Sequence, residues 1–239
     1  MKRPEFGRPV VFPERYGDDW RAPFERPILE RMAEGSAVLD IGSGRHPAIT
    51  PDRRPLGVQY VGLDLSASEL AAAGEGAYTE VVEADAAALR PELEDRFDLV
   101  VSWQVLEHVR DLESTITHIH RYVRPGGTFV ALFSGAWAAF AVANRLIPNR
   151  AGSKIVDRIM HRTAANMPVF PAFYDRCYYS PLRRMLASWT EFTITPLFGG
   201  AGYFRVAPPI QRLYLEYENV IARRPVKNLA THYLVVATR

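Results

Sequence analysis

The sequence contains a single cysteine, Cys177, among its 239 residues. One cysteine excludes an internal disulfide and any metal centre built from several thiolates. Long hydrophobic runs are also missing: the most apolar stretch, residues 128–143, includes Ser134 and Gly135 and is shorter than the roughly 20 residues that span a bilayer. The N-terminus has no apolar core of the kind found in secretory signals. These absences predict a cytoplasmic protein without stable membrane insertion.

Excess charge is missing too. Lysine and arginine number 29 against 27 acidic residues, and no dense basic stripe with interleaved aromatics occurs, so a nucleic-acid partner is not expected. His118 and His120 are two positions apart and cannot share a helical face, so no metal site is expected there. A hydrophobic content of 48% over this length fits one large α/β domain.

The stretch Ala37-Val-Leu-Asp-Ile-Gly-Ser-Gly44 organises the rest of the chain. Its apolar residues predict a buried parallel strand over residues 37–41. Gly42 and Gly44, on either side of Ser43, permit a tight turn that lets backbone approach a ligand closely. Doubly wound sheets bind nucleotides at such a turn. The acid Asp40 precedes the first glycine and the third glycine of the dinucleotide fingerprint is absent, which counts against a NAD-dependent oxidoreductase.

Two further acids follow predicted strands. Asp64 ends the second strand, residues 58–63, and lies 64 − 40 = 24 positions after Asp40, a spacing that suits a carboxylate accepting hydrogen bonds from a ribose diol. Ser66 is expected to cap a short helix. Asp85 follows a third strand over residues 79–82; it either contacts the ligand or caps a helix over residues 86–89.

The fourth and fifth strands come with recognisable flanks. A strand from Asp98 through residues 99–102 leads to Trp103-Gln104 and to Leu106-Glu-His-Val109, which is expected to open a helix. Arg121-Tyr-Val-Arg-Pro-Gly-Gly-Thr-Phe-Val130 then reads as a helix end, a turn and the fifth strand. Together with the glycine turn, these blocks resemble the class I S-adenosylmethionine (SAM)-dependent methyltransferases of small molecules over about residues 35–133.

The resemblance implies an α/β fold: a doubly wound, seven-stranded Rossmann-like sheet with an antiparallel last strand and a helical insert after the fifth strand. We expect one domain over residues 1–239. Its parts are an N-terminal cap (1–34), a SAM-binding core (35–134), an acceptor-side insert (135–189) and a last section (190–239). In the last section a helix over residues 208–223 separates strands at 190–198 and 231–238. That helix is expected to form a homodimer surface or a wall of the substrate site.

The resemblance also implies SAM as cofactor and S-adenosylhomocysteine as product. In the family an acid at the place of Asp85 accepts from the adenine amino group, and the backbone N–H of its neighbour, here Ala86, donates to the ring. The expected cofactor residues are Asp40, Gly42, Ser43, Gly44, Asp64, Leu65, Asp85, Ala86, Trp103 and Tyr16. Tyr16, with Arg15 and Trp20, either lines the methionine end of SAM or packs a helix over residues 23–33 onto the sheet. Pro27 fits that helix only in its first turn.

Transfer to a hydroxyl requires a base. His108 is the first candidate, because an imidazole accepts protons near neutral pH, and Glu107 is the second; packing is the alternative role for His108. Five aromatic and charged residues suit a sugar ring or a phenol, or else a structural helix start: Tyr174, Asp175, Arg176, Tyr178 and Trp137. Cys177 is expected to be a small buried filler.

The preferred function is that of a SAM-dependent O-methyltransferase acting on a small polar acceptor. A sugar or oligosaccharide in saccharide biosynthesis is the favoured acceptor, because residues 170–177 loosely resemble bacterial saccharide O-methyltransferases. One alternative is a lipophilic, quinone-like acceptor, since methyltransferases of quinone biosynthesis share the Leu-Glu-His-Val block; another is a carboxylate. From a different class, the chain could be a SAM-binding scaffold without activity.

Overall fold

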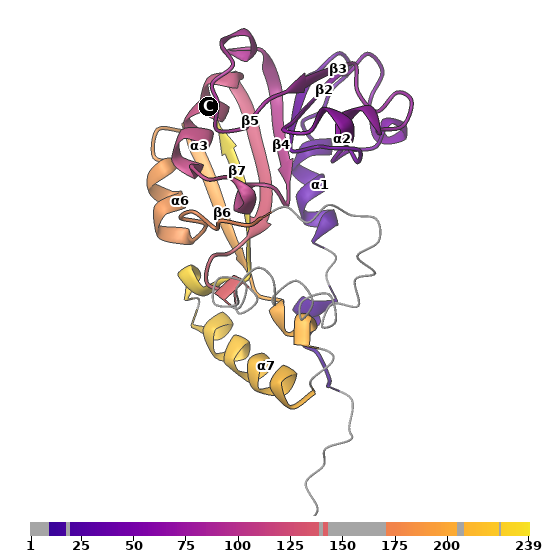
Figure 1. Ribbon diagram of the computed structural model, residues 1–239. Coiled ribbons are helices and arrows are strands. Elements are labelled where there is room, and N and C mark those ends of the chain that lie inside the picture. The colour runs from indigo at the N-terminus through magenta and orange to yellow at the C-terminus, as the bar shows by residue number, and fades with distance from the viewer. Residues whose placement is uncertain (1–9, 18–19, 139–140, 143–170, 205–207, 225) are drawn as a thin grey trace, which may run out of the picture.

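Seven strands form one sheet in the order β3-β2-β1-β4-β5-β7-β6 (Figure 1). The computed structural model describes residues 10–17, 20–138, 141–142, 171–204, 208–224 and 226–239. The strands are β1 (Ala37–Ile41), β2 (Gln59–Asp64), β3 (Glu80–Glu83), β4 (Phe97–Trp103), β5 (Val123–Ser134), β6 (Glu191–Leu197) and β7 (His232–Thr238). Strands β1 to β5 pair in parallel, and β7 runs antiparallel to both β5 and β6. The expected sheet with an antiparallel last strand is therefore confirmed.

Helices cover both faces of this sheet. The α-helices are α1 (Arg21–Leu29), α2 (Ala67–Ala71), α3 (Leu112–Tyr122), α6 (Tyr179–Met185) and α7 (Pro208–Arg223). The 3₁₀ helices are η1 (Glu14–Tyr16), η2 (Pro51–Arg53), η3 (Pro91–Leu93), η4 (Leu106–His108), η5 (Gly200–Phe204) and η6 (Lys227–Leu229). Most of the predicted insert, residues 135–189, lies outside the described residues, so its helical character stays a prediction.

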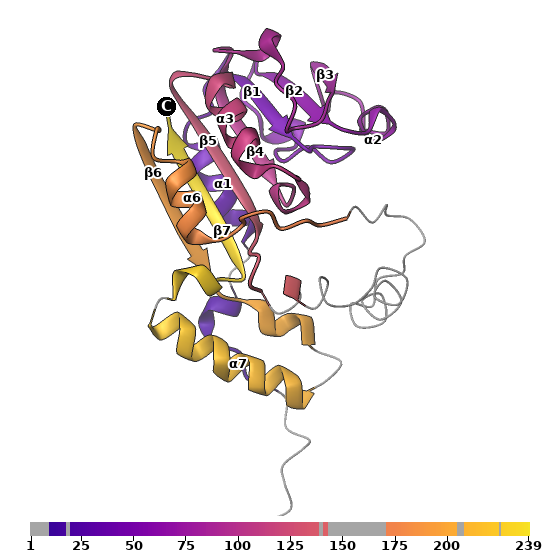
Figure 2. The ribbon, with the colours of Figure 1, turned by 60° about the vertical axis from the view of Figure 1, so that its left-hand side comes forward.

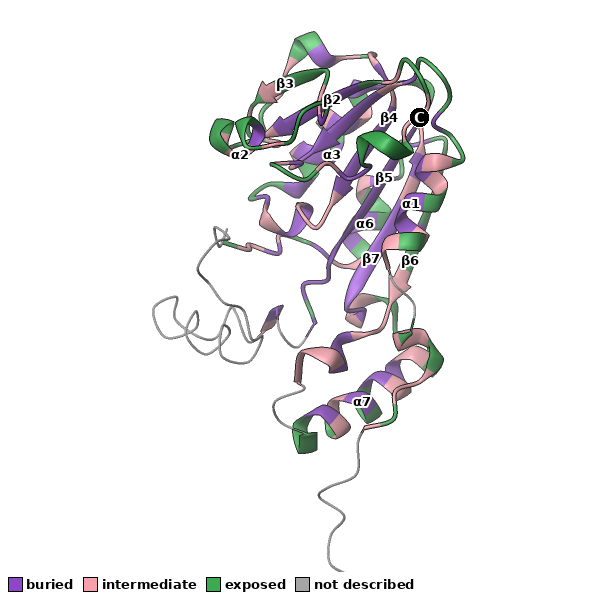
Figure 3. Ribbon diagram, turned by 90° about the vertical axis from the view of Figure 1, so that its right-hand side faces the viewer, coloured by how far each residue is buried: buried purple, intermediate pink, exposed green. Residues whose placement is uncertain are grey.

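Side chains alternate between the two faces of each strand, which divides the core into two layers. Val38 of β1 belongs to the same core cluster as Phe24 and Ile28 of α1, while its neighbour Leu39 belongs to the other cluster, with Ile116 of α3 and Leu182 of α6. The central strands are almost wholly buried (Figure 3). Burial on both faces explains why β1, β4 and β5 are apolar without a polar alternation.

Four local expectations need correction. Pro27 lies well inside α1, beyond the first turn, and Pro23 occupies the first turn instead. No helix forms over residues 86–89: the Asp85 carboxylate accepts from the backbone N–H of Ala87 (2.9 Å) and the Asp85 carbonyl from the N–H of Ala88 (2.9 Å), which closes a single turn. Leu106–His108 forms only a 3₁₀ turn; the α-helix begins at Leu112, where Asp111 accepts from the N–H of Ser114 (3.1 Å).

The fourth correction concerns Pro125-Gly-Gly127, which does not precede the fifth strand. It lies within the bounds of β5, as an irregularity of the pairing with β4. Phe97 pairs with Val123 and Leu99 with Thr128, so the extra residues of β5 bulge out between these two pairs. The turn that the sequence predicts is therefore a bulge near the start of a longer strand.

Parallel strands leave the sheet at one edge, which we call the carboxyl edge. The turns after β1, β2, β3, β4 and β5 all lie there. Figures 1 and 2 show α7 beyond the end at which β5 finishes and β7 begins. The expected helix over residues 208–223 is confirmed with those bounds and interrupts the last hairpin. No helix among the described residues is long and apolar enough to cross a membrane.

Candidate functional site

The turn after β1 is shaped by two glycines in left-handed conformations. Gly42 has φ +70°, and a Cβ added to it would lie 2.3 Å from a methyl carbon of Val105. Its N–H donates to the carbonyl of Leu63 in β2 (2.7 Å). Because Val105 follows β4, this turn is pressed between the ends of β1, β2 and β4. Only glycine fits at position 42. The turn that it permits brings the backbone of Gly44 next to Asp64.

Asp64 holds the turn from the end of β2. Its Oδ2 accepts from the N–H of Gly44 (3.0 Å) and its Oδ1 from the N–H of Ser66 (2.9 Å). Ser66 in turn caps α2, as expected, by accepting from the N–H of Glu69 (3.3 Å). On the other side, the Tyr78 hydroxyl donates to the carbonyl of Gly44 (2.9 Å). The Asp64 carboxylate is partly exposed, so each oxygen keeps capacity for a hydroxyl of a ribose.

The adenine-side residues follow the neighbouring strand. Asp64 pairs with Glu83 at the end of β3, and the N–H of Ala84 donates to the Asp64 carbonyl (2.9 Å). Asp85 and Ala86 come directly after this contact, with Asp85 exposed. Leu65 is 65% exposed at the same edge. These residues and the glycine turn therefore gather at the carboxyl ends of β1, β2 and β3, where doubly wound sheets bind nucleotides.

Asp40 does not face this edge as an open ligand. It is 1% exposed, and its Oδ2 accepts from the N–H of Ala48 (2.6 Å) and from the Tyr60 hydroxyl (2.8 Å). Burial raises its pKa to about 7, against the lowering effect of the Ala48 and Tyr60 hydrogen bonds and of nearby Arg54 and Arg21. The acid that precedes the glycine turn thus anchors the loop between β1 and β2 from inside the protein.

This burial predicts an unusual pH dependence. The folded pKa of about 7 lies above the 3.8 of an unfolded aspartate, so the unfolded chain gives up this proton first and stability falls as pH rises from about 4 to 7. The shift corresponds to at most about 4 kcal/mol. Asp40→Asn keeps an oxygen for Ala48 and loses the titration. We expect its free energy of unfolding, relative to the wild type, to increase between pH 5 and pH 8 in denaturant titrations; a constant difference would contradict the assignment.

Tyr16 is engaged by the far end of the chain. Its hydroxyl donates to Glu218 of α7 and accepts from the N–H of Ala201 (3.2 Å). Arg15 reaches the same region by donating to Asn219 (2.8 Å). Trp20 packs against His232 of β7, with ring centroids 4.1 Å apart and the ring planes tilted by 50°. These contacts favour the packing interpretation of Tyr16 and Trp20 over a place at the methionine end of SAM.

Trp103 ends β4 on the α1 side of the sheet. Its ring lies 4.9 Å from that of Phe24, and the Arg21 guanidinium sits 4.6 Å above it. Arg21 also donates to the carbonyl of Ala48 and to Glu25 (2.5 Å). Trp103 therefore links α1 to the end of β4, and its place in the cofactor site stays a prediction.

Glu107 and His108 are held by the return segment, residues 171–178, which follows the insert. The Glu107 carbonyl accepts from the N–H groups of Phe173 and Tyr174, both at 2.9 Å. His108 Nδ1 lies 3.1 Å from the carbonyl oxygen of Pro171. The Cys177 thiol, fully buried as expected, contacts the carbonyl of Leu106 (3.7 Å). The return segment thus fixes the backbone that carries both candidate bases.

The Glu107 side chain points into the protein. It is 3% exposed; Oε1 accepts from the N–H of Ser134 (3.2 Å), and Oε2 has no hydrogen-bond partner among the described residues. Burial raises its pKa, and the neighbouring His108 lowers it by less. The Ser134 hydroxyl contacts Gln104 (3.4 Å) and His232 (3.3 Å), and burial lowers the pKa of His232 to about 3. Glu107, Ser134 and His232 therefore form a buried polar cluster at the ends of β4 and β5, in which the His232 imidazole is neutral.

The five expected substrate residues separate into two groups. Asp175 accepts from the N–H of Leu112 (3.1 Å), and Arg176 pairs with Glu113 (2.5 Å) and with Asp175 (3.3 Å). This charged pair caps the start of α3, and Tyr174 is 5% exposed, so these three residues support the structural alternative. Tyr178 and Trp137 instead pack edge to face, with ring centroids 6.2 Å apart, and Trp137 is 47% exposed.

Sequence reasoning missed the groups that hold the glycine turn from behind. Arg54 donates to the carbonyls of Ile49 (2.6 Å) and Ala77 (2.8 Å) while its guanidinium lies 3.5 Å above the Tyr60 ring. Tyr60 also accepts from the N–H of Ile49 (3.1 Å). Nothing in the local pattern distinguishes Tyr60 from other strand residues, and its acidic partner Asp40 lies on another strand.

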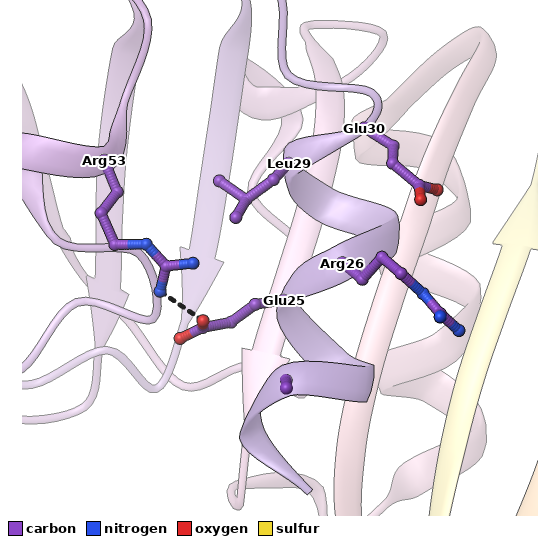
Figure 4. Close-up of a pocket in the computed structure, with 6 residues that line it drawn as sticks. Glu25, Arg26, Leu29, Glu30 and Arg53 are labelled. Carbon is purple, nitrogen blue, oxygen red and sulfur yellow. Dashed lines mark hydrogen bonds and ion pairs between the residues drawn. The ribbon is translucent and has the colours of Figure 1, made fainter. Parts of the chain in front are cut away.

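A shallow cavity of about 440 Å³ lies between α1 and η2 (Figure 4). Glu25 points across it to pair with Arg53, whereas Arg26 and Glu30 point to the other side of α1. None of its lining residues belongs to the glycine turn, to the end of β2 or to the end of β4. The ion pair between Glu25 and Arg53 links α1 to the loop after β1. The cavity is not the cofactor site.

Comparison with known proteins agrees with this geometry. A family model described as a methyltransferase domain matches residues 15–164, more than half of the chain. A ubiquinone biosynthesis O-methyltransferase of Rhizobium johnstonii is 36% identical over 122 residues, 49% of either chain. Another from Rhodopseudomonas palustris is 35% identical over 114 residues, 46% of this chain and 45% of the relative. The chain spans about half the length of the curated relatives it matches.

Solved structures share the fold at low identity. Phosphoethanolamine N-methyltransferase 2 of Haemonchus contortus, in complex with S-adenosyl-L-methionine, has a TM-score of 0.56 at 14% identity and covers 92% of this chain and 52% of its own. Geranyl diphosphate C-methyltransferase of Streptomyces coelicolor has a TM-score of 0.55 at 15% identity, covering 91% and 79%. The sheet is thus that of SAM-dependent methyltransferases. Because a family model matches more than half of the chain, the chain belongs to the methyltransferase domain family, in agreement with the class that the sequence predicts.

Proposed function

We propose that the chain transfers a methyl group from SAM to a hydroxyl of a small lipophilic aromatic acceptor, of the phenolic kind found in quinone-type molecules. His108, held by the return segment that also carries Tyr178 of an aromatic pair, is the observation that carries this proposal. The names of the curated relatives support a quinone-like acceptor better than the sugar that the sequence favours. SAM supplies an electrophilic methyl group on a positively charged sulfur; Asp64, Asp85 and the glycine turn are the residues to hold it.

The hydrogen-bond geometry of His108 suits a base. A carbonyl oxygen only accepts, so the contact with Pro171 assigns the proton of a neutral imidazole to Nδ1 and leaves the lone pair on Nε2. His108 is half-buried, so Nε2 can meet an acceptor hydroxyl. Glu107 is nearly inaccessible, with Oε1 bonded to Ser134. We therefore rank His108 as the base that takes the hydroxyl proton and Glu107 as the alternative.

The partly exposed aromatic pair of Trp137 and Tyr178 favours an aromatic ring over a sugar. Sugars are bound by planar polar side chains as well as by aromatic faces, and here Asp175 and Arg176 are taken up by the start of α3. Trp137, which is 47% exposed and packs edge to face with Tyr178, comes three residues after Ser134, whose N–H reaches Glu107. Flat apolar rings pack well against such a pair. The acceptor is then placed by stacking and its hydroxyl by His108.

We expect His108→Ala to lower kcat by about 10²- to 10⁴-fold, the usual contribution of a positioned base. The Kd for SAM, measured by calorimetry, should stay within about twofold, because His108 follows β4 and its ring bonds to Pro171 of the return segment, not to the turns after β1, β2 and β3. His120→Ala is the matched control: His120 lies on α3 with its ring 4.9 Å from Trp189. Turnover at the wild-type rate in His108→Ala would exclude His108 as the base and leave Glu107→Gln as the variant to measure.

The acceptor class is tested by methyl transfer from SAM to four kinds of acceptor: catechols and hydroquinones, sugars, carboxylic acids and amines. The proposal expects turnover on the phenolic set and a loss of kcat/KM in Trp137→Ala. Turnover on sugars alone would restore the saccharide acceptor. Saturable SAM binding with no turnover on any class would instead favour a non-catalytic SAM-binding scaffold.

A further inference from the structure

The outer face of α7 carries an apolar stripe. Ile210, Leu213, Tyr217 and Val220 recur at intervals of three and four residues, so they follow one line along the helix. All four are exposed, Leu213 to 74%. Val226, just beyond the helix, is exposed as well. Figure 3 shows exposed residues recurring along α7, whereas the central strands are buried.

The stripe is not needed to attach α7 to the protein. The opposite face is buried through Gln211, Leu215, Glu218 and Ile221. Glu218 is fully buried and accepts from the N–H of Gly200 and from the Thr231 hydroxyl, each at 2.7 Å. Gln211 donates to the carbonyl of Ala201 (3.1 Å). The helix is thus fixed by one face, and the four stripe residues form a second apolar face, none of which is buried.

Basic residues border the stripe at its C-terminal end. Arg223 and Arg224 are exposed and enter no ion pair with an acid among the described residues, and Lys227 follows in η6. From Asn219 to the C-terminus the sequence contains no acidic residue. An apolar stripe beside such cations is the pattern of helices that lie in the interface of an anionic bilayer. The same cations also complement the helix dipole, which does not require the stripe.

A second copy of the chain is the other occupant to consider. Over the ten residue-to-residue steps from Ile210 to Val220 the stripe is about 15 Å long, at 1.5 Å per residue. With a width of roughly 10 Å it offers on the order of 150–250 Å², well below the ~800 Å² per partner of a stable interface. A lipid surface needs no complementary protein face. Its anionic headgroups can also bind the cations at the C-terminal end of the stripe.

We infer that α7 docks the protein on an anionic lipid surface, with the apolar stripe in the headgroup region and Arg223, Arg224 and Lys227 on the anionic headgroups. Figures 1 and 2 place α7 beyond the carboxyl-edge end of β5. If the acceptor is lipophilic, as proposed above, such docking would hold the protein at the surface in which that acceptor resides. The inference goes beyond the proposed function and does not depend on it, because surface binding is measured without turnover.

The test is cosedimentation of the full chain with phosphatidylcholine vesicles containing about a third phosphatidylglycerol. We expect the wild type to bind, to bind several-fold less to pure phosphatidylcholine, and to be released by high salt. Leu213→Glu and Val220→Glu should each lower the partition coefficient about tenfold. Leu56→Glu is the matched control, since Leu56 is 79% exposed in the loop after β1.

Two measurements keep the result unambiguous. Calorimetric SAM binding should be unchanged in Leu213→Glu, which shows that the variant is folded and separates this inference from the proposed function. Light scattering without vesicles should report a monomer for the wild type. No vesicle binding by the wild type, equal binding by Leu213→Glu, or a dimer that Leu213→Glu dissociates would each overturn docking on lipid, the last in favour of a second copy.

Discussion

Replacing Gly42 by alanine is expected to weaken SAM binding by at least about 100-fold. An alanine at φ +70° costs roughly 1–2 kcal/mol, and its Cβ would lie 2.3 Å from the Val105 side chain. Val105 is β-branched and cannot turn its methyl groups away, because even its Cβ would be 2.8 Å distant. The turn must therefore move, and with it the N–H of Gly44 that meets Asp64. The Kd is measured by calorimetry with SAM and with S-adenosylhomocysteine.

Gly76→Ala is the matched control for this substitution. Gly76 has φ +73°, and a Cβ there would meet nothing within 4 Å. It therefore carries the backbone strain without the clash. Both variants should unfold at lower denaturant concentration than the wild type, and only Gly42→Ala should lose SAM affinity. Wild-type affinity in Gly42→Ala would show that the turn does not hold the cofactor.

The sheet is largely predictable from the sequence because its signals are local. The apolar run at residues 37–41 gives β1 with the same bounds, and the amphipathic pattern at 208–223 gives α7 with the same bounds. Short helices are less predictable. The Asp85 carboxylate bonds to Ala87 as a helix cap would, yet its segment makes a single turn, whereas a similar bond from Asp111 starts α3 at Leu112. The same kind of side-chain bond thus occurs with and without a helix, and no periodic pattern in the sequence separates the two cases.

The candidate site is predictable only where it is made of backbone. The glycine turn and Asp64 lie as expected, because their conformations follow from residue type and strand order. Tyr16 and Arg176 are different, because their partners are distant in sequence. Tyr16 bonds to Glu218 and Arg176 pairs with Glu113. Without these partners in view, the sequence cannot distinguish either side chain from a ligand-binding group. Asp40 is predictable only in part: its place before the glycine turn can be recognised in the sequence, but its hydrogen bond from Tyr60 cannot.

Asp64→Ala is expected to lower SAM affinity by about two orders of magnitude while the fold persists. The variant removes the acceptor for a ribose diol and also the anchors of Gly44 (3.0 Å) and Ser66 (2.9 Å). Hydrogen bonds to a charged group are each worth roughly 1.5–3 kcal/mol, so losing the ribose contacts alone accounts for a change of this size. Calorimetry gives the Kd, and thermal unfolding without ligand gives the stability.

Asp64→Asn separates the two roles of this carboxylate. An amide keeps one oxygen, which can still accept from Gly44, but its NH₂ group cannot accept from Ser66 or from a ribose hydroxyl. We therefore expect an affinity between those of the wild type and Asp64→Ala, with stability close to the wild type. Asp52→Ala, a substitution in the exposed η2 turn, is the control for removing a negative charge. If Asp64→Ala bound SAM as the wild type does, Asp64 would only support the turn, and the ribose would have to find its acceptor elsewhere at the carboxyl edge.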